Sequence, residues 1–475
     1  MVDQSELAFR RLTRRYGAQL VYTPMINAKM FADTTHKYRE QNFDIASGEE
    51  GAPSLLSSSS SDTDRPLIVQ FCSNDPDALL RSAKLVEAHC DAVDINLGCP
   101  QDIARRGHYG SFLQDEWDLI YNMINTLHKN LSVPVTAKFR VFPSIEKTVE
   151  YAKMLERAGA QIITCHGRTR EQRGQNTGLA SYAHIAAVKR AVSIPVFANG
   201  NVLFAADVQR CIDETGADGV MSAEGVLYNP ALFRGLSTSS TPTEEQRHNH
   251  TRSELTPPLP HSTLALEYLS IVRSQRTRTS PSAVKGHLFK ILRPALGREG
   301  YHDLREKIGK VRVTVPKRLE EGKEEEGWAW VDEYEEIVRQ VAQRLEIDER
   351  ITTQNGTVPI ENLVVKDEKT GLDVLPWWIA QPYFRPLPPD VPVDPHGKKA
   401  GKVKVVEAEK AKDQKDQKEL LHDCTNSVEP AAGAVPAKRR PPEEIDGDAG
   451  SSADGDGVKR VKLALEEGGV AVGAV

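Results

Sequence analysis

One cysteine stands where a strand is expected to end. In the stretch "DINLGCPQDIARRGHYGSFL", residues 94 to 113, Val93, Ile95 and Leu97 alternate with polar residues, and Cys99 follows in a Gly-Cys-Pro corner. Period-two alternation predicts a half-buried β-strand. A thiol with an ordinary pKa of about 8.5 is mostly protonated near neutral pH, so Cys99 suits a proton donor. A thiolate nucleophile would instead need a nearby cation or a helix N-terminus.

Residues that can bind or react follow the other expected strands as well. They share one position, at the C-terminal end of an apolar β-rich run or directly after it, and they are Pro24-Met25-Ile26, Gln70, Asn96, Lys138, Arg140, His166, Arg168, Asn199-Gly200-Asn201 and Ala223-Glu224. Polar groups at such places cost free energy unless something binds there. The last two runs lie in short, small-residue segments, whose backbone N–H groups can approach a ligand closely.

The elements that carry these residues repeat along residues 16–235 as strand, loop and amphipathic helix. Strands are expected at Leu20–Pro24, Phe43–Ala46, Leu67–Phe71, Ala92–Leu97, Val135–Phe139, Gln161–Cys165, Pro195–Ala198 and Gly219–Ser222. Helices are expected at Asp77–His89, Asp115–Lys129, Ser144–Ala158, Tyr182–Ala191 and Ala205–Thr215. This rhythm predicts an α/β fold, a (β/α)8 TIM barrel. An open doubly wound sheet is the alternative, but no G-x-G-x-x-G follows the first strand.

A TIM barrel places its working residues at the C-terminal ends of its strands. Barrels often hold phosphate at the loops after strands seven and eight. With Gln70 and Lys138 directed toward the barrel axis, the expected ligand is a phosphorylated planar cofactor, and FMN fits. Other interpretations stay open here: Lys138 as a solvated side chain or a Schiff-base lysine, His166 as a donor to a backbone carbonyl, and Asn-Gly as a plain turn.

Composition limits the class of protein. The chain has 475 residues, 39% of them hydrophobic, a formal net charge of −6 and a mean hydropathy of −0.45. No apolar run approaches the roughly 18 residues that span a bilayer, so we expect no membrane association. The N-terminus carries charges where a signal peptide has an apolar segment. Six cysteines without a CxxC pair predict free thiols in a reducing compartment and no metal site.

The charge is distributed unevenly, which suggests the domain boundaries. We expect the barrel at 1–235 with a Ser-rich low-complexity insert at about 47–65, a linker at 236–262, a helical domain at 263–345, an extension at 346–385 and a disordered tail at 386–475. Residues 263–318 hold thirteen Lys or Arg against four Asp or Glu, a local charge of +9. A basic helical module therefore lies within an acidic chain.

Seven motifs together resemble a known family. They are "YTPMINAKMF", "LIVQFCSNDP", "DINLGCPQDIARRGHYGSFL", "AKFRVF", "CHGRTREQRG", "FANGNV" and "GVMSAEGVLYNPALF". In this order they resemble the tRNA-dihydrouridine synthases, in the eukaryotic branch that acts on uridines 16 and 17 of the D-loop. The resemblance is strong over residues 6–235 and looser to about 345. "PWWIAQPYFRP", near residues 376–386, is similar to the segment that follows in this branch.

The resemblance implies an FMN-bearing barrel and a helical tRNA-binding domain. NADPH reduces the flavin, the target base is flipped into the pocket, hydride passes to C6 of uracil, and a cysteine protonates C5. Carried onto this chain, Cys99 is the acid. Pro24, Met25, Ile26, Gln70, Lys138, His166, Asn199, Gly200, Asn201, Ala223 and Glu224 hold FMN, and Asn96, Arg140 and Arg168 lie near the substrate. Many relatives have Gly-Arg where this chain has Ala223-Glu224, which leaves the phosphate contacts there open.

The expected partners are tRNA and NAD(P)H, with no membrane and no metal, and we expect a monomer. The loop behind Cys99, with its Arg105-Arg106 pair, is interpreted as a lid. Two other functions stay open: an FMN barrel that acts on a small pyrimidine, and a tRNA-binding protein without catalysis. "PAKRRPPEE" and "GVKRVKLAL" in the tail resemble nuclear-import signals, so the expected location is cytoplasmic and/or nuclear.

Overall fold

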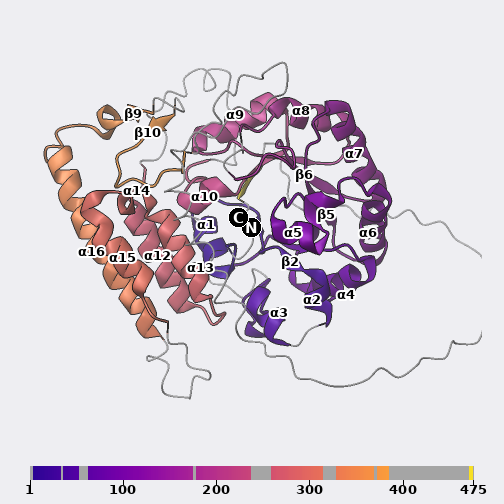
Figure 1. Cartoon of the computed structure of the whole chain (residues 1–475), viewed down its shortest axis with the longest axis horizontal. Coiled ribbons are helices and arrows are strands. Elements are labelled where there is room, and N and C mark those ends of the chain that lie inside the picture. The colour runs from indigo at the N-terminus through magenta and orange to yellow at the C-terminus, as the bar shows by residue number, and fades with distance from the viewer. Residues whose placement is uncertain are drawn as a thin grey trace, which may run out of the picture. The chain divides into compact units, whose positions relative to one another are not determined.

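A parallel sheet forms the centre of the molecule. The computed structural model of the chain describes residues 4–33, 36–52, 63–174, 178–236, 258–313, 328–367, 372–384 and 470–473. The strands are β1 (Val21–Tyr22), β2 (Ile26–Asn27), β3 (Leu67–Cys72), β4 (Ala92–Leu97), β5 (Val135–Arg140), β6 (Ile162–His166), β7 (Val196–Asn199), β8 (Gly219–Ser222) and β11 (Val470–Gly473). They follow the order β1-β3-β4-β5-β6-β7-β8-β11, with β2 paired on β3. The sheet curls into the TIM-barrel-like arrangement that the sequence predicted (Figure 1).

The predicted second strand is wrong. Residues 43–46 do not form a strand; a 3-10 helix, η1, covers Ile45–Ser47 instead. Asp44 caps it by accepting from the backbone N–H of Ser47 at 3.2 Å, and Gly48 ends it at φ 72°. Capping by a short polar side chain competes with strand pairing. The first strand therefore pairs directly with β3, first through β1 and then, past Thr23-Pro24-Met25, through β2.

The last strand lies in the segment that was expected to be a tail without structure. Val470–Gly473 runs parallel to β8, with Val470 opposite Gly219 and Gly473 opposite Ser222. Alternating valines and small residues in "GVAVGAV" favour an extended chain. The rest of the predicted tail, with both basic motifs, lies outside the described residues, as do most of the linker and the middle of the insert.

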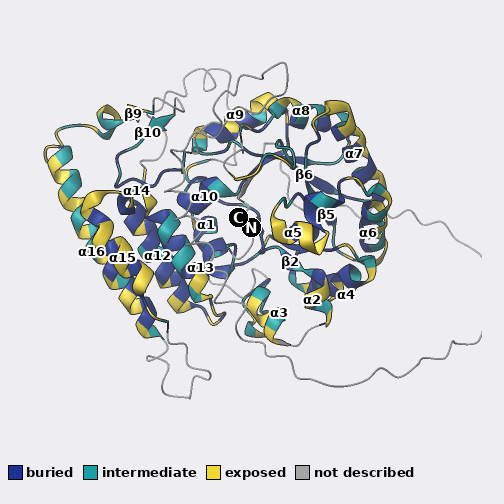
Figure 2. Ribbon diagram, viewed as in Figure 1, coloured by how far each residue is buried: buried dark blue, intermediate teal, exposed yellow. Residues whose placement is uncertain are grey.

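Helices surround the sheet and supply its outer wall (Figure 2). They are α4 (Pro76–Val86), α6 (Trp117–Asn130), α7 (Ile145–Ala158), α8 (Tyr182–Ala191) and α9 (Ala205–Thr215), and each contacts the next along the chain. Their starts follow capping rules, because Asp75, Ser144 and Ser181 each accept a backbone N–H of the first turn. Before β3 the chain forms α2 (Ala28–Asp33) and α3 (His36–Asn42). None of the described helices is long and apolar enough to cross a bilayer.

The basic module predicted after residue 262 is helical. It comprises α12 (His261–Ser274), α13 (Pro281–Ile291), α14 (Arg293–Leu296), η6 (Glu299–Tyr301), α15 (His302–Lys310) and α16 (Ala329–Thr352). After it come η8 (Ile360–Leu363) and the antiparallel pair β9 (Val365–Lys366) and β10 (Asp373–Val374). Helix α16 continues through residue 345, where the module was expected to end. The barrel and these helices belong to one compact unit.

Helix α1 (Leu7–Arg15) joins the barrel to the module. It contacts α12, and just before it Glu6 accepts hydrogen bonds from Tyr268 Oη at 2.6 Å and from His287 Nε2 at 3.0 Å. Burial alone would raise the pKa of Glu6, but the charge and hydrogen bond of His287 and the hydroxyl of Tyr268 outweigh it and hold that pKa below its ordinary value. The ionised Glu6 is therefore part of the contact between the two parts.

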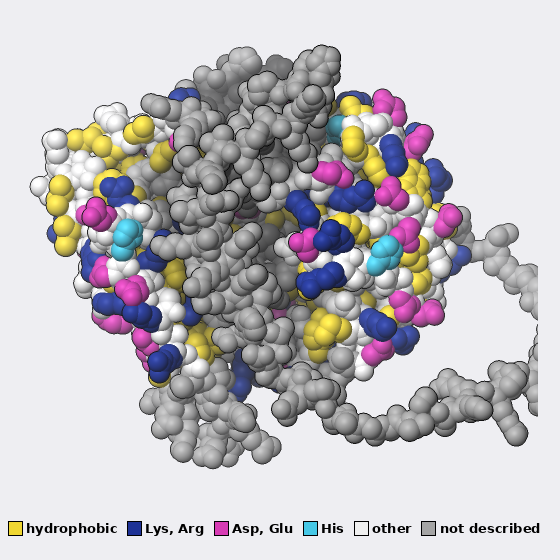
Figure 3. All heavy atoms as spheres, viewed as in Figure 1, with side chains coloured by type: hydrophobic (Ala, Val, Ile, Leu, Met, Phe, Trp, Pro, Cys, Tyr) yellow, Lys and Arg dark blue, Asp and Glu magenta, His cyan; other side chains and the backbone are white. Residues whose placement is uncertain are grey.

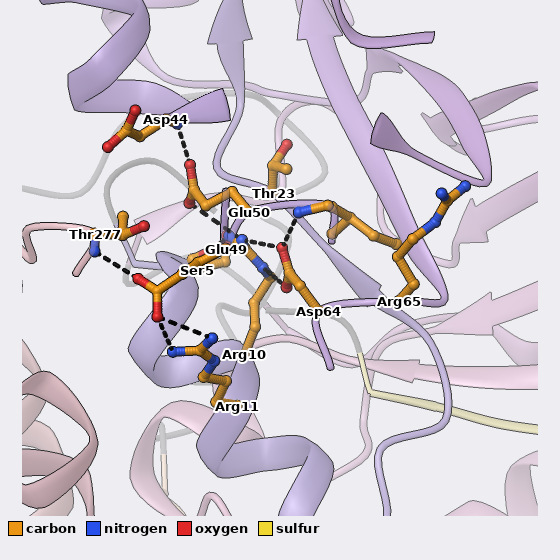
Figure 4. A network of polar contacts seen from close by, with 12 residues as sticks. Ser5, Arg10, Arg11, Thr23, Asp44, Glu49, Glu50, Asp64, Arg65 and Thr277 are labelled. Carbon is orange, nitrogen blue, oxygen red and sulfur yellow. Dashed lines mark hydrogen bonds and ion pairs between the residues drawn. The ribbon is translucent and has the colours of Figure 1, made fainter. Parts of the chain in front are cut away.

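A second connection is the buried network around Arg10 (Figure 4). The guanidinium donates to both carboxylate oxygens of Asp64 at 2.7 Å, to Glu50 at 3.2 Å and to the carbonyl of Ser5 at 2.7 Å. Glu50 and Asp64 lie in the two ends of the predicted low-complexity insert, and both are buried. We call Arg10, Glu50 and Asp64 the Arg10 network. Its ion pairs fix the ends of the insert against α1.

Candidate active site

Side chains alternate along each strand, so those that face the barrel interior form layers. An apolar cluster lies toward the starts of the strands: Leu20, Tyr22, Ile68, Ala92, Ile162, Phe197 and Met221. Residues two and four positions further along the same strands face the same side because successive side chains alternate. The register sets Asn96 beside Lys138 and His166 beside Asn199. The structure thus brings these four predicted residues, with Gln70, to one end of the sheet.

A chain of amides leads from the strand ends into the barrel. Asn96 Nδ2 donates to Gln70 Oε1 at 2.9 Å, and Gln70 Nε2 donates to Asp94 Oδ2 at 2.8 Å. Thr136 Oγ1 donates to the other Asp94 oxygen at 2.6 Å. Burial raises the pKa of Asp94 to about 6 although these hydrogen bonds oppose the shift. The side chain of Gln70 is therefore held in one orientation by partners at both ends.

Lys138 is the cation nearest to this chain of amides. Its Nζ donates to Asn199 Oδ1 at 3.1 Å, and Asn199 Nδ2 donates to the carbonyl of Met221 at 2.9 Å. Burial, and next the charge of Arg140, lower the pKa of Lys138 to about 8. No ion pair between Lys138 and a carboxylate occurs within the described ranges. The ammonium is thus a charge that an anionic ligand would stabilise.

Cys99 is held at its backbone by Asn96 and Ser111. Asn96 Oδ1 accepts the N–H groups of Gly98 and Cys99 at 3.1 and 2.9 Å, while the N–H and Oγ of Ser111 donate to the Cys99 carbonyl. Gly110 has φ 66°, and a Cβ there would lie 2.8 Å from the Cys99 carbonyl oxygen. The half-buried thiol has its pKa raised, chiefly by burial. The thiol therefore stays protonated at neutral pH.

The segment behind Cys99 is a short helix rather than an open loop. Helix α5 (Asp102–Gly107) exposes Arg105 and Arg106, and Figure 3 shows Lys and Arg side chains gathered around its position. From the loop after β6, Arg173 donates to the Pro100 carbonyl at 2.8 Å and to Asp102 at 3.2 Å. The lid function assigned to this segment stays a prediction.

Arg140 and Arg168 make hydrogen bonds to the loops around them. Arg140 donates to the carbonyls of Gly98, Thr169 and Gln172 at 2.8, 2.9 and 3.0 Å. Burial, and next the charge of Arg168, lower its pKa to about 10. The Nε of Arg168 donates to the Gly178 carbonyl at 3.0 Å. These contacts connect the strand ends; direct substrate contact by Arg140, Arg168 or Asn96 stays a prediction.

His166 is a neutral imidazole. Its Nε2 lies 3.2 Å from Nη1 of Arg168, whose Nη2 donates to Asn201 Oδ1 at 3.1 Å. Burial, and then the charges of Arg140, Lys138 and Arg168, hold the pKa of His166 well below its ordinary value. A neutral ring can accept the Arg168 hydrogen bond at Nε2.

The loop after β7 packs on the segment after β6, and a short helix follows β8. Gly200 has φ 119°, and a Cβ there would lie 2.6 Å from the Cβ of Ala180. Asn201 has φ 60° and exchanges two hydrogen bonds with the backbone of Ala180, both at 2.9 Å. Ala223 precedes helix α10 (Glu224–Tyr228). Burial lowers the pKa of Lys290 on α13 while the charge of Glu224 opposes the shift, so the module brings a cation near Glu224.

Three predicted residues come from the first strand. Thr23 accepts the N–H of Gln70 at 3.0 Å and donates to the Pro24 carbonyl at 3.0 Å. Met25 packs with Cys99 on a small cluster that contains Cys72 and Tyr109. Ile26 differs, because its side chain is fully buried in the main apolar core. Its assignment to cofactor binding stays a prediction without a contact to the other strand-end residues.

Three residues at or near the site were missed from the sequence. Asp94 and Thr136 face the same side as Asn96 and Lys138, and a polar residue at every second position of a strand was the available signal. Lys290 could not be found, because it comes from a helix 66 residues beyond Glu224. Within the described residues, no group of three or more His, Cys, Asp or Glu side chains is arranged to hold a metal ion.

Comparison with known proteins places the chain in a family. A sequence profile described as "Dihydrouridine synthase (Dus)" matches residues 1–311. The chain is 44% identical over 401 residues to the "tRNA-dihydrouridine(16/17) synthase [NAD(P)(+)]" of Saccharomyces cerevisiae, covering 82% of each. It is 46% identical to the "tRNA-dihydrouridine(16/17) synthase [NAD(P)(+)]-like" protein of Mus musculus, covering 82% of this chain and 68% of that one. A Schizosaccharomyces pombe protein with the same name as that of Saccharomyces cerevisiae is 42% identical, covering 82% and 87%.

The match extends through every predicted strand end, from the first strand to the basic module. The chain belongs to the dihydrouridine synthase family and is an oxidoreductase.

Proposed function

We propose that this protein is a flavin-dependent tRNA-dihydrouridine synthase that reduces the C5–C6 bond of a D-loop uridine, at position 16 or 17, with NADPH as reductant. The observation that carries the proposal is the half-buried thiol of Cys99 just after β4, with burial raising its pKa, next to the partly buried Lys138 on β5, whose ammonium donates to Asn199 and forms no ion pair with a described carboxylate. The names of the relatives from yeast and mouse support the substrate and its position.

The residues at the strand ends fit FMN. Lys138 supplies a positive charge without an ion pair to a described carboxylate, Gln70 supplies a fixed amide, and Gly200 lets the loop after β7 pack closely on Ala180. Pro24, Met25, His166, Asn199, Asn201, Ala223 and Glu224 complete the set that would hold the cofactor. When bound, the flavin supplies a hydride to C6 of uracil.

Cys99 completes the addition of hydrogen. Hydride at C6 leaves negative charge that C5 relieves by taking a proton, and the Sγ–H bond of Cys99 supplies it. The resulting thiolate takes a proton from solvent before the next turnover. Since burial raises its pKa, the thiol remains an acid through neutral pH, and we expect the contribution of Cys99 to the rate to fall when the pH rises past that raised pKa.

The target uridine can enter the site because it lies in the D-loop of the tRNA, where it is not base-paired. A base is flipped at a cost of a few kcal/mol, and least where it is already unstacked. The exposed Lys and Arg residues of the helical module provide phosphate contacts, whose contribution falls steeply with salt. The NAD(P)H half-reaction needs no domain of its own if the nicotinamide and the uracil occupy the same face of the flavin in turn.

Replacing Cys99 tests the proposal. Cys99→Ala is expected to keep flavin and tRNA binding and to reduce dihydrouridine formation about 100- to 10,000-fold at neutral pH, because a positioned acid contributes that much. Cys90→Ala is the matched control, since Cys90 precedes β4 at its other end and is fully buried. Mapping of dihydrouridine in tRNA before and after incubation gives the readout.

Two results would contradict the proposal. Unchanged turnover in Cys99→Ala would remove the acid assignment. Oxidation of the reduced flavin by free uridine at the rate seen with tRNA would instead favour an enzyme of small pyrimidines.

A further inference from the structure

A pocket outside the proposed active site lies between the basic module and the segment 363–384. Its volume is about 570 Å³, within the range of about 300–1,000 Å³ typical of ligand sites. We call it the aromatic–arginine pocket and define it by Tyr228, Arg293, Arg298, Trp377, Tyr383 and Phe384. None of these side chains has a role in the proposed chemistry.

Two arginines in this pocket stack on aromatic rings. The guanidinium of Arg293 lies 3.9 Å from the ring centre of Tyr383, and that of Arg298 lies 3.9 Å from the ring centre of Trp377. Both arginines are exposed, and neither forms an ion pair with a carboxylate in the part of the chain that the structure describes. Stacking covers one face of a guanidinium and leaves the N–H donors at its edge available for a phosphate.

Asp348 holds one of the two stacked rings in place. Asp348 Oδ2 accepts Trp377 Nε1 at 3.0 Å and Tyr301 Oη at 2.7 Å, so it fixes the ring on which Arg298 stacks. Asp367 is the acidic residue among those that line the pocket. Two rigidly stacked cations against one lining carboxylate make this pocket suited to an anion.

The pocket borders the proposed active site. Phe384 packs against Phe204, with ring centres 6.1 Å apart, and Tyr383 packs against Tyr228 at 5.7 Å. Phe204 begins α9 after β7, and Tyr228 ends α10 after β8. These are the two loops proposed to lie at the flavin phosphate, so a molecule that enters the barrel at the strand ends passes close to the pocket.

We propose that the aromatic–arginine pocket binds one unstacked nucleotide of the tRNA other than the reacting uridine. Arg293 and Arg298 contact its phosphate, and its base stacks on the outer faces of the guanidinium–aromatic pairs. Unpaired RNA bases stack on aromatic rings and on guanidinium planes, which is the chemistry that this pocket presents. The inference rests on the proposed function, because it takes tRNA as the substrate.

The open position of the arginines favours RNA over the dinucleotide NADPH. Both side chains are exposed on the surface of the stretch 263–318, whose sequence has thirteen Lys or Arg against four Asp or Glu. A polyanion can use such a surface over its whole length, whereas a dinucleotide would meet the pocket alone.

The main test is the double variant Arg293→Ala/Arg298→Ala in the full chain. We expect its affinity for tRNA, measured by fluorescence anisotropy, to fall about tenfold. The slope of log affinity against log salt should become shallower by about 1 to 2, because each arginine bound to a phosphate contributes about 1 to that slope. Lys153→Ala/Arg157→Ala is the matched control, because these two exposed cations lie on α7, which packs on α6 and α8.

Trp377 provides a second variant pair. Trp377→Phe keeps an aromatic face and should stay within about threefold of the wild type, whereas Trp377→Ala should weaken tRNA binding about 5- to 20-fold. Both variants lose the hydrogen bond to Asp348, so the comparison isolates the ring. Circular dichroism melting confirms that each variant is folded.

Each outcome decides the inference. Loss of tRNA affinity in the arginine variant, with an unchanged KM for NADPH and an unaffected control, supports it. Affinity equal to that of the control overturns it and leaves the pocket as packing for the segment 376–384. A raised KM for NADPH with normal tRNA affinity also overturns it, and assigns the pocket to the dinucleotide. If the wild type neither binds tRNA nor forms dihydrouridine, the proposed function has failed rather than this inference alone.

Discussion

Two buried clusters of charge in this protein are built in opposite ways. In the Arg10 network the cation meets two carboxylates, Asp64 and Glu50, and the pKa of Arg10 is raised because their attraction outweighs burial. At the strand ends Lys138 and Arg140 are partly buried, and their pKa values are lowered to about 8 and about 10. Burial and cation–cation repulsion dominate there, and no described carboxylate pairs with either group.

The difference suggests a structural role for the Arg10 network and a ligand-binding role for the cluster at the strand ends. A buried charge without a partner is costly, and a ligand of opposite charge would offset that cost. In the Arg10 network the cation finds its partners within the chain, and the ion pairs fix segments to one another. At these two places the pKa of the cation shifts in opposite directions, up in the Arg10 network and down at the strand ends.

The largest effect on stability is expected when the Arg10 network loses its cation. Arg10→Met leaves Asp64 and Glu50 buried without a cation, and we expect a loss of about 3–5 kcal/mol in the free energy of unfolding. Urea denaturation at pH 7 measures it. Arg81→Met is the control, because Arg81 and Asp33 form an exposed ion pair at 2.8 Å that should contribute less than about 1 kcal/mol. Equal losses in the two variants would contradict the view that the Arg10 network is a structural anchor.

Replacing Lys138 should have the opposite result, with little change in stability and a large loss of flavin affinity. Lys138→Met relieves a buried charge, so the unfolding free energy of the flavin-free protein should stay within about 1 kcal/mol of the wild type, while FMN affinity falls at least about tenfold. Flavin titration and urea denaturation measure the two quantities. Lys189→Met removes a lysine that is paired with Asp218, so it should lower stability and leave flavin affinity unchanged. Normal flavin affinity in Lys138→Met would make the strand-end cluster structural.

The sequence predicted the strand-end cluster much better than the Arg10 network. Period-two alternation in β4 and β5 is local, so it places Asn96 and Lys138 on one face without knowledge of the rest of the fold. Arg10 and Asp64 are 54 residues apart, and Asp64 lies beside a Ser-rich run that reads as a solvated loop. Pairing over such a distance depends on the fold and leaves no local pattern.

Errors in the predicted elements have similar causes. The strand expected at 43–46 was based on an apolar pair, Phe43 and Ile45. In the structure Asp44 caps a turn of 3-10 helix in this segment. The basic residues behind Cys99 were expected to form a loop, although "DIARRG" also fits the short helix that forms. In both segments the sequence is too short for periodicity to distinguish one element from another.

The last effect concerns Glu50, the carboxylate of the Arg10 network that shares Arg10 with Asp64 and makes the longer contact to it. Burial, with the charge of Asp64 added, raises the pKa of Glu50 to about 7 although Arg10 opposes the shift. The folded state then holds the proton more tightly than the unfolded state, whose carboxyl titrates near 4.5. This contribution to stability is complete below about pH 4.5 and is lost as the pH rises through about 7.

Glu50→Gln removes the titration while it keeps a neutral acceptor for Arg10. We expect the variant to match the wild type within about 1 kcal/mol at pH 5 and to gain relative to it between pH 5 and pH 8, because only the wild type must ionise a buried carboxyl over this range. Urea denaturation at four pH values measures the difference. Glu49→Gln removes the adjacent charge and leaves Arg10, Asp64 and Glu50 in place. A pH-dependent difference confined to Glu50→Gln therefore belongs to the network, and a constant difference between pH 5 and pH 8 would mean that Glu50 is ionised throughout and that Arg10 compensates both carboxylates.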